Sequence, residues 1–153
     1  MKKLLCLALL LCLTACSVTS VPTQPYQPEL AAQLVEADVF SEPLEPLDED
    51  LIWILYELDQ SKAPQADLTG AAGYCSTGAT CEQVLVLCFS RQESAATAHE
   101  ILSNYLDGQL SVNRSYRPAE VGKLEKAILS QRGSTLLLLV ANDYDAAARL
   151  INK

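Results

Sequence analysis

Two kinds of hydrophobic pattern alternate along the chain and predict helices and strands in turn. Apolar residues recur every three or four positions over 29–40, from Glu93 onwards and over 146–151, and this spacing predicts amphipathic helices. Nearly unbroken apolar runs over 84–89 and 134–141 predict strands that are buried on both faces. We therefore expect these two strands at the centre of a sheet, with the first helices covering its second face.

Capping and turn residues mark the ends of these segments. Four predicted helix starts carry side chains that cap helices; they are Asp48, Thr80 with Gln83, Ser90 with Glu93, and Asn142 or Asp143. Pro118 suits the first turn of a further short helix, and Gly133 suits the turn of a hairpin. Asp107-Gly108 fits either the end of the long helix or a kink in it, although Leu110 continues the same apolar face.

The order of the elements predicts an α+β fold. Two helices, two strands, a long and a short helix, two more strands and a last helix follow one another over 29–153. We expect a single domain in which helices pack on a largely antiparallel four-stranded sheet; the strands are predicted over 66–76, 84–89, 127–131 and 134–141. The acidic, proline-containing stretch 41–50 is predicted to be a solvated loop, because its carboxylates lack the spacing of a calcium-binding loop.

The start of the chain has the features of a lipoprotein signal peptide. Lys2 and Lys3 precede an apolar run over 4–13, which is about half the ~20 residues that a spanning helix needs. The run ends in Leu13-Thr14-Ala15-Cys16, a lipobox with a small residue before the cut and a cysteine that accepts a diacylglycerol. We predict a signal peptide over 1–15 and a lipid on Cys16 that anchors the protein at the outer face of the cytoplasmic membrane.

Residues 16–28 are predicted to comprise the lipidated cysteine and a flexible tether. Pro22, Pro25 and Pro28 favour extended chain, and Tyr26 is the one aromatic residue of the segment. Two acyl chains on Cys16 suffice for stable membrane attachment. The domain is therefore expected to stand off the bilayer.

Charge excludes one class of partner. The chain has a formal net charge of −8, and loss of Lys2 and Lys3 with the signal peptide leaves −10. Such an acidic domain is not expected to bind nucleic acid or to lie on anionic lipid head groups. The expected partners are the membrane, through the anchor alone, and an envelope protein or a small extracellular ligand.

Three of the six cysteines remain once the signal peptide and the lipidated residue are set aside. Cys75 and Cys81 could close a short disulfide loop, and Cys88 lies in an apolar run as a small buried hydrophobe. The alternative is three free thiols. The spacing matches neither a two-residue-gap redox pair nor paired zinc ligands, so a structural bridge and three free thiols are both favoured over catalysis.

A group of aromatic and hydrogen-bonding side chains at the end of the long helix is the candidate binding patch. It comprises Tyr105, Gln109, Arg114, Tyr116 and Arg117. The competing interpretation is that Tyr105 belongs to the core and that Tyr116 with Pro118 only holds the following loop.

No residue pattern predicts a catalytic, metal or cofactor site. His99 is the one histidine and is expected on the exposed side of the long helix, without a nucleophile motif to complete a triad. Asp143 and Asp145 stand where a strand meets a helix, and helix capping accounts for them better than a bound cation. The glycines lack the spacing of a phosphate-binding loop.

Several segments resemble the bacterial lipoprotein family known as domain of unknown function 4358. They are Phe40 to Leu47 leading to Leu51 and Tyr56, Tyr74 to Glu82, Gln109 with Tyr116-Arg117-Pro118, and the Gly133 hairpin followed by Leu136 to Asp143. The resemblance covers the whole predicted domain and implies an extracytoplasmic location and this fold, but no established activity. Tyr105 departs from it, standing where the family is expected to have a basic residue.

Three functional hypotheses follow. The first is a non-enzymatic, membrane-anchored module that binds an envelope protein or a small extracellular ligand. The second is a thiol-dependent redox protein or enzyme that uses Cys75 and Cys81. The third is a structural or assembly role without a small ligand, which an exposed apolar patch would favour.

Overall fold

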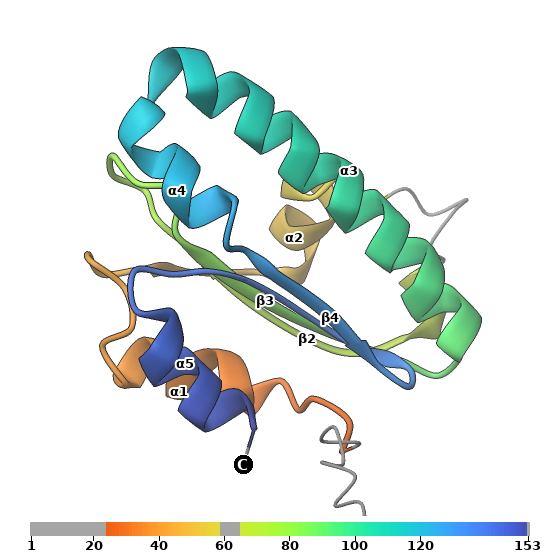
Figure 1. Ribbon diagram of the computed structural model, residues 1–153. Coiled ribbons are helices and arrows are strands. Elements are labelled where there is room, and N and C mark those ends of the chain that lie inside the picture. Colours follow the sequence, from red (N-terminus) through yellow and green to blue (C-terminus); the bar gives the residue numbers. More distant parts are fainter. Residues whose placement is uncertain (1–23, 59–64, 153) are drawn as a thin grey trace, which may run out of the picture.

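Five strands form one antiparallel sheet in the computed structural model, which describes residues 24–58 and 65–152 (Figure 1). The sheet order is β1-β2-β3-β5-β4, and the strands are β1 (Glu45–Leu47), β2 (Leu68–Cys75), β3 (Gln83–Phe89), β4 (Ile128–Arg132) and β5 (Thr135–Val140). The domain is thus a single α+β unit with a wholly antiparallel sheet. The predicted signal peptide and Cys16 lie outside the described residues.

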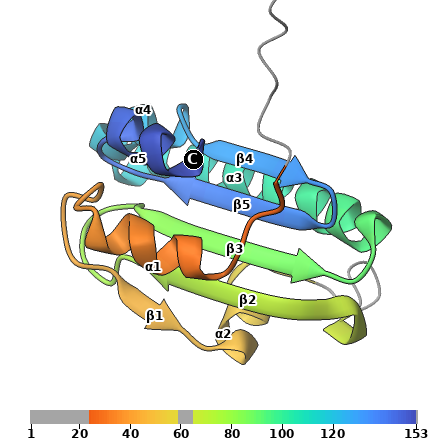
Figure 2. The ribbon, with the colours of Figure 1, turned by 90° about the horizontal axis from the view of Figure 1, so that it is seen from below.

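Helices cover both faces of this sheet. They are α1 (Glu29–Glu36), α2 (Glu49–Leu55), α3 (Gln92–Tyr116), α4 (Val121–Leu124) and α5 (Tyr144–Ile151), with short 3-10 turns at Gln65–Asp67 and Pro118–Glu120. Figure 2 shows α1 and α5 on one face, whereas α2 and α3 lie on the other. Within the described residues, no helix has the length and apolar character needed to cross a membrane.

The two apolar strands predicted to be central are β3 and β5. Their side chains alternate between the two faces of the sheet and pack in a separate core on each face. Val84 and Leu137 are among the side chains that pack with α1 and α5, whereas Leu85 and Leu138 pack with α2 and α3. All four side chains are at most 1% exposed. Burial on both faces explains why the sequence of each strand is a nearly unbroken run of apolar residues. The two N-terminal helices are divided between the faces instead of covering one of them together.

The prediction of four strands is wrong by one, because β1 forms within the stretch predicted to be a solvated loop. Glu45 pairs with Cys75, and Leu47 pairs with Gly73, at the outer edge of β2. Pro46 has no N–H to donate, which an edge strand tolerates. Three residues with a proline carry too weak a local pattern to predict a strand, and pairing with β2 supplies the missing constraint.

Two of the four predicted helix caps are confirmed. Asp48 accepts from the Leu51 N–H at 2.7 Å, and Asp143 accepts from the Ala146 N–H at 2.8 Å. The predicted caps at Thr80 and Ser90 are wrong, because Gln83 begins a strand and Arg91 is the residue before α3, with no side-chain cap. Both hydroxyls instead bond carboxylates elsewhere in the fold, Thr80 to Glu42 and Ser90 to Asp67. Helix α3 continues for 25 residues through Asp107-Gly108.

The folded domain starts earlier than the predicted tether boundary at residue 28. Tyr26 is only 3% exposed, and its N–H donates to Thr135 Oγ1 at 2.8 Å. Its hydroxyl donates to Ser130 Oγ, and the Arg132 guanidinium stacks 4.3 Å from the ring centroid. A single aromatic residue in a proline-rich stretch is therefore enough to tie the entering chain to the hairpin of β4 and β5.

The turn of that hairpin yields the first prediction. Gly133 has a φ of +59°, and a Cβ there would meet no atom within 4 Å, so a substitution acts through the backbone alone. We expect Gly133→Ala to lower the free energy of unfolding by about 1 kcal/mol, measured by urea denaturation. Gly133→Asn is the matched variant and should lose less, since Asn tolerates this region. Equal losses for both would contradict the backbone explanation.

Candidate functional site

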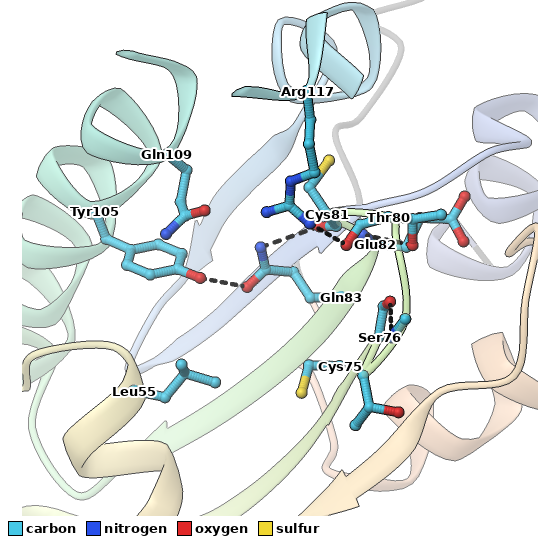
Figure 3. Close-up of a pocket in the computed structure, with 12 residues that line it drawn as sticks. Leu55, Cys75, Ser76, Thr80, Cys81, Glu82, Gln83, Tyr105, Gln109 and Arg117 are labelled. Atoms are coloured by element: carbon cyan, nitrogen blue, oxygen red, sulfur yellow. Dashed lines mark hydrogen bonds between the residues drawn. The ribbon is translucent and has the colours of Figure 1, made fainter. Parts of the chain in front are cut away.

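A pocket of about 220 Å³ lies at the end of the sheet where β2 ends and β3 begins (Figure 3). We call it the α3 pocket. Its principal lining residues are Leu55 from α2, Cys75 and Gln83 from the sheet, Tyr105 and Gln109 from α3, and Arg117 just after α3. Cys81 and the loop over 76–80 close the remaining side.

The structure brings together three of the five residues of the predicted binding patch. Tyr105, Gln109 and Arg117 line the α3 pocket, whereas Arg114 and Tyr116 are exposed and do not line it. Tyr105 and Gln109 are four residues apart, so both lie on the face of α3 that is directed to the end of the sheet. Sequence spacing alone did not show that Arg117 turns back to this face beyond the helix end.

Tyr105 forms part of the pocket wall and also belongs to the core. Its hydroxyl donates to Gln83 Oε1 at 3.1 Å, and its ring meets Tyr56 edge-on at 5.0 Å between centroids. Burial raises the pKa of Tyr105 to about 12, so the phenol is a neutral hydrogen-bonding group at physiological pH. The two interpretations weighed for Tyr105 therefore both describe part of its environment.

Arg117 ties the end of α3 to the loop over 76–80. Its Nε donates to Asn113 Oδ1 at 2.8 Å, and its Nη1 donates to Thr80 O at 3.1 Å and reaches Ala79 O at 3.5 Å. Asn113 is fully buried and donates to Gln109 O. The loop over 76–80 is thus held by Arg117. Tyr116, which the competing interpretation places against the loop that follows α3, is 81% exposed.

Glu42 holds the other side of the same loop. Its carboxylate accepts from the hydroxyls of Ser76 and Thr80, and these hydrogen bonds lower the pKa of Glu42. A Cβ on Gly78 would lie 2.7 Å from a Glu42 oxygen, so the loop passes closer to the carboxylate than other residues allow. The acidic stretch predicted to be solvated therefore contributes a specific structural contact.

A buried ion pair lies behind the pocket. Glu82 is fully buried, and its carboxylate accepts from Lys123 Nζ at 2.9 Å and from the Ser41 N–H and hydroxyl, each at 2.8 Å. Lys123 also lies 3.2 Å from Glu120. Burial alone lowers the pKa of Lys123, but its bonds to Glu82 and Glu120 raise it overall. The sequence patterns did not predict this cluster. Its one signal in the sequence is an acidic residue, Glu82, directly before the apolar strand β3.

The three remaining cysteines are free thiols in the structure, which is the second of the two predicted alternatives. Cys75 and Cys81 both line the α3 pocket. Cys81 Sγ donates to Glu120 Oε2 at 3.4 Å, and burial, followed by that carboxylate, raises the pKa of Cys81 to about 12. Burial and the charge of Glu45 also raise the pKa of Cys75. Both thiols are therefore kept protonated.

The other candidates lie away from this pocket. His99 is partly buried and lines a separate hollow between α3 and β4, and Asp143 caps α5 as expected. Asp145 is exposed in the first turn of α5, where the helix dipole favours a carboxylate. Among the residues that the structure describes, no three His, Cys, Asp or Glu side chains are grouped as metal ligands would be.

Comparison with known proteins identifies no match among protein-family models, curated proteins or solved structures. The resemblance to domain of unknown function 4358 therefore stays a prediction. Three of the segments that carry it meet around the α3 pocket, through Glu42, the 76–82 segment, and Gln109 with Arg117.

The ion pair behind the pocket gives a stability prediction. We expect Lys123→Ala to lower the free energy of unfolding by about 3 kcal/mol, because it leaves the carboxylate of Glu82 buried without its cation. Urea denaturation followed by circular dichroism measures the loss. Lys126→Ala is the control, since Lys126 is exposed, and it should change stability by less than about 0.5 kcal/mol. Similar losses for both variants would show that Lys123 does not compensate the buried charge.

Proposed function

We propose that this protein is a lipid-anchored, extracytoplasmic, non-enzymatic binding module whose ligand or partner docks at the α3 pocket. The lipobox supports the anchor, and the grouping of Tyr105, Gln109 and Arg117 in one concave site supports binding. That grouping is the observation that carries the proposal, because three of the five predicted patch residues and both candidate cysteines converge on a single opening.

The position at which the chain enters the domain supports presentation of the pocket away from the membrane. Tyr26 bonds Thr135 Oγ1 at the hairpin end of β5, and Thr135 pairs with Cys88 near the end of β3. The pocket lies at the other end, where Gln83 begins β3. Seven strand residues at about 3.3 Å each separate the two ends by roughly 20 Å. A chain anchored through Cys16 therefore leads into the end of the domain opposite the pocket.

The chemistry of the lining favours binding over catalysis. The tyrosine and the two thiols are all protonated at neutral pH, because burial raises the pKa of each. His99 belongs to a different hollow and cannot act as a base for either thiol. Gln83 and Gln109 add neutral amides. The pocket thus offers hydrogen bonds and shape without an activated nucleophile.

A thiol-dependent redox protein or enzyme is the second candidate, because Cys75 and Cys81 line the same pocket. Such activity needs at least one thiol with a lowered pKa. In Figure 3 the two sulfur atoms lie on opposite sides of Gln83, with the sulfur of Cys75 on the Leu55 side and that of Cys81 beside Arg117. This separation and the raised pKa values weigh against the second candidate.

Labelling kinetics separate the two candidates. We expect iodoacetamide at pH 8 to label Cys75 and Cys81 of the native chain more slowly than those of the urea-unfolded chain, because burial raises both pKa values. Labelling of native Cys81 should still be accelerating above pH 9, the ordinary pKa of a cysteine thiol, because burial raises the pKa of Cys81. Mass spectrometry resolves the sites, and Cys88 serves as the internal control with a thiol pKa also raised by burial. Fast labelling of native Cys75 with a midpoint below pH 8 would support the enzyme.

The binding proposal is tested in the cell that makes the protein. A photo-crosslinking amino acid at Leu55, in the pocket wall, is compared with one at Arg149, which is exposed on α5. We expect one defined adduct from Leu55, none from Arg149, and loss of the adduct in Cys16→Ala, which also fails to incorporate an alkyne fatty acid. Equal adducts from both positions would contradict docking at the pocket, and unchanged acylation of Cys16→Ala would contradict the anchor.

A further inference from the structure

Large apolar side chains that are exposed to solvent gather on two helices beside the α3 pocket. Within the described residues they all lie on α2 and the last turns of α3; they are Leu51, Ile54, Leu55, Val112 and Tyr116. Ile54 is 74% exposed and Tyr116 is 81% exposed, so neither contributes to the core. Exposed apolar groups clustered in this way mark interaction sites in soluble domains.

The spacing of these side chains places them along the two rims of the pocket. On α3, Val112 and Tyr116 follow Gln109 by three and seven residues and so continue the face that lines the pocket. On α2, Leu51 precedes Leu55 by one turn, and Leu55 itself lines the pocket. Helix α2 also buries Ile52 and Trp53, so the exposed side chains of Leu51, Ile54 and Leu55 extend its apolar surface beyond the side that packs in the core.

Two polar groups of the lining have donors left over. Arg117 uses Nε and Nη1 on neutral acceptors, its Nη2 has no partner, and it forms no ion pair within the described residues. The carboxamide of Gln109 likewise has no hydrogen bond in the part of the chain that the structure describes. Figure 3 shows both side chains directed into the opening above Tyr105 and Gln83. A partly buried guanidinium bonded only to neutral groups is best completed by a carboxylate.

Three carboxylates near the pocket are bonded to groups other than Arg117. Glu42 is engaged by Ser76 and Thr80, and Glu82 is directed to Ser41 and Lys123 on the far side of the strand. Glu120 is bonded by Cys81 and Lys123. The charges of Glu45 and Glu57 act on Cys75 and Tyr105, but neither residue forms an ion pair with Arg117. Within the described residues Arg117 thus has no carboxylate partner, and its positive charge is left for a group from outside.

We infer that the α3 pocket binds a peptide segment of another protein, which places a carboxylate against Arg117 and Gln109 and large apolar side chains against the rims on α2 and α3. This inference rests on the proposed function and names its ligand. The exposed rims extend beyond a pocket of about 220 Å³, so the occupant is larger than the pocket. The carboxylate belongs either to an acidic side chain or to the end of the partner chain, and both present the same group.

The probe is a library of random heptapeptides with free carboxyl termini, selected against the full chain in detergent. We expect the enriched peptides to combine a carboxylate with large apolar residues. Resynthesis of each peptide with Asp→Asn or Glu→Gln, or with an amidated terminus, identifies which carboxylate binds, and removal of that one should weaken binding about tenfold, or about 1.4 kcal/mol. Fluorescence polarisation measures the dissociation constants.

Variants of Gln109 provide a test that a structural defect cannot imitate. Its side chain bonds no group in the described structure, so Gln109→Glu and Gln109→Lys should both fold, which thermal unfolding checks. We expect Gln109→Glu to weaken the selected peptides about tenfold and Gln109→Lys to strengthen them, since the added charges act oppositely on a carboxylate. Arg114→Gln removes an exposed arginine outside the pocket and should leave affinity unchanged.

The outcomes separate this inference from the proposed function. If the enriched peptides lack a carboxylate, or if the two Gln109 variants have equal effects, the role of a carboxylate in binding is rejected. The pocket would still be a peptide-binding site. If no peptide is enriched and Leu55 crosslinks to a defined small molecule, a peptide is rejected as the ligand, and the pocket is retained as the binding site. Absence of both would reject the site itself.

Discussion

The buried carboxylate of Glu82 is the constraint on which this end of the domain depends. A charge that is fully removed from water must be paired and hydrogen-bonded, and Lys123 and Ser41 meet that requirement from two distant segments. Lys123 brings in the short helices after α3, and Ser41 brings in the segment before β1. Arg117 immediately precedes those short helices and Glu42 adjoins Ser41, so both anchors of the loop over 76–80 follow from this one pair.

The loop anchors in turn determine the character of the α3 pocket. Glu42 and Arg117 hold the loop from opposite sides, so the wall that closes the pocket is built from hydrogen bonds rather than from apolar packing. Glu42, Glu82 and Glu120 are all bonded in this arrangement, whereas the outer donors of Arg117 are not. An acidic protein thereby acquires a pocket lined by an arginine that forms no ion pair within the described residues, which a net charge of −8 does not reveal.

Elements with a strong local signal could be predicted from the sequence, and those that depend on distant contacts could not. β3, β5 and the Gly133 hairpin have long apolar runs and a turn residue between strands, and α3 has a persistent helical period that overrides Asp107-Gly108. β1 exists only because β2 offers an edge. In the site, Tyr105 and Gln109 follow from helical spacing, but the return of Arg117 to the 76–80 loop depends on where α3 ends. No local sequence pattern indicates how close the end of α3 lies to that loop.

Several large apolar side chains on α2 and at the end of α3 are exposed to solvent. Burial of Leu51, Ile54 or Tyr116 would stabilise the folded state by about 25 cal/mol for each square ångström of apolar surface removed from water. This domain nevertheless leaves them exposed beside the α3 pocket, at the end away from Tyr26. Two cores already satisfy both faces of the sheet, so these side chains are not needed for folding. Their position on both rims, around an arginine without an anion, is what the proposed peptide partner requires, since such a partner would cover the rims and neutralise the charge in the same contact.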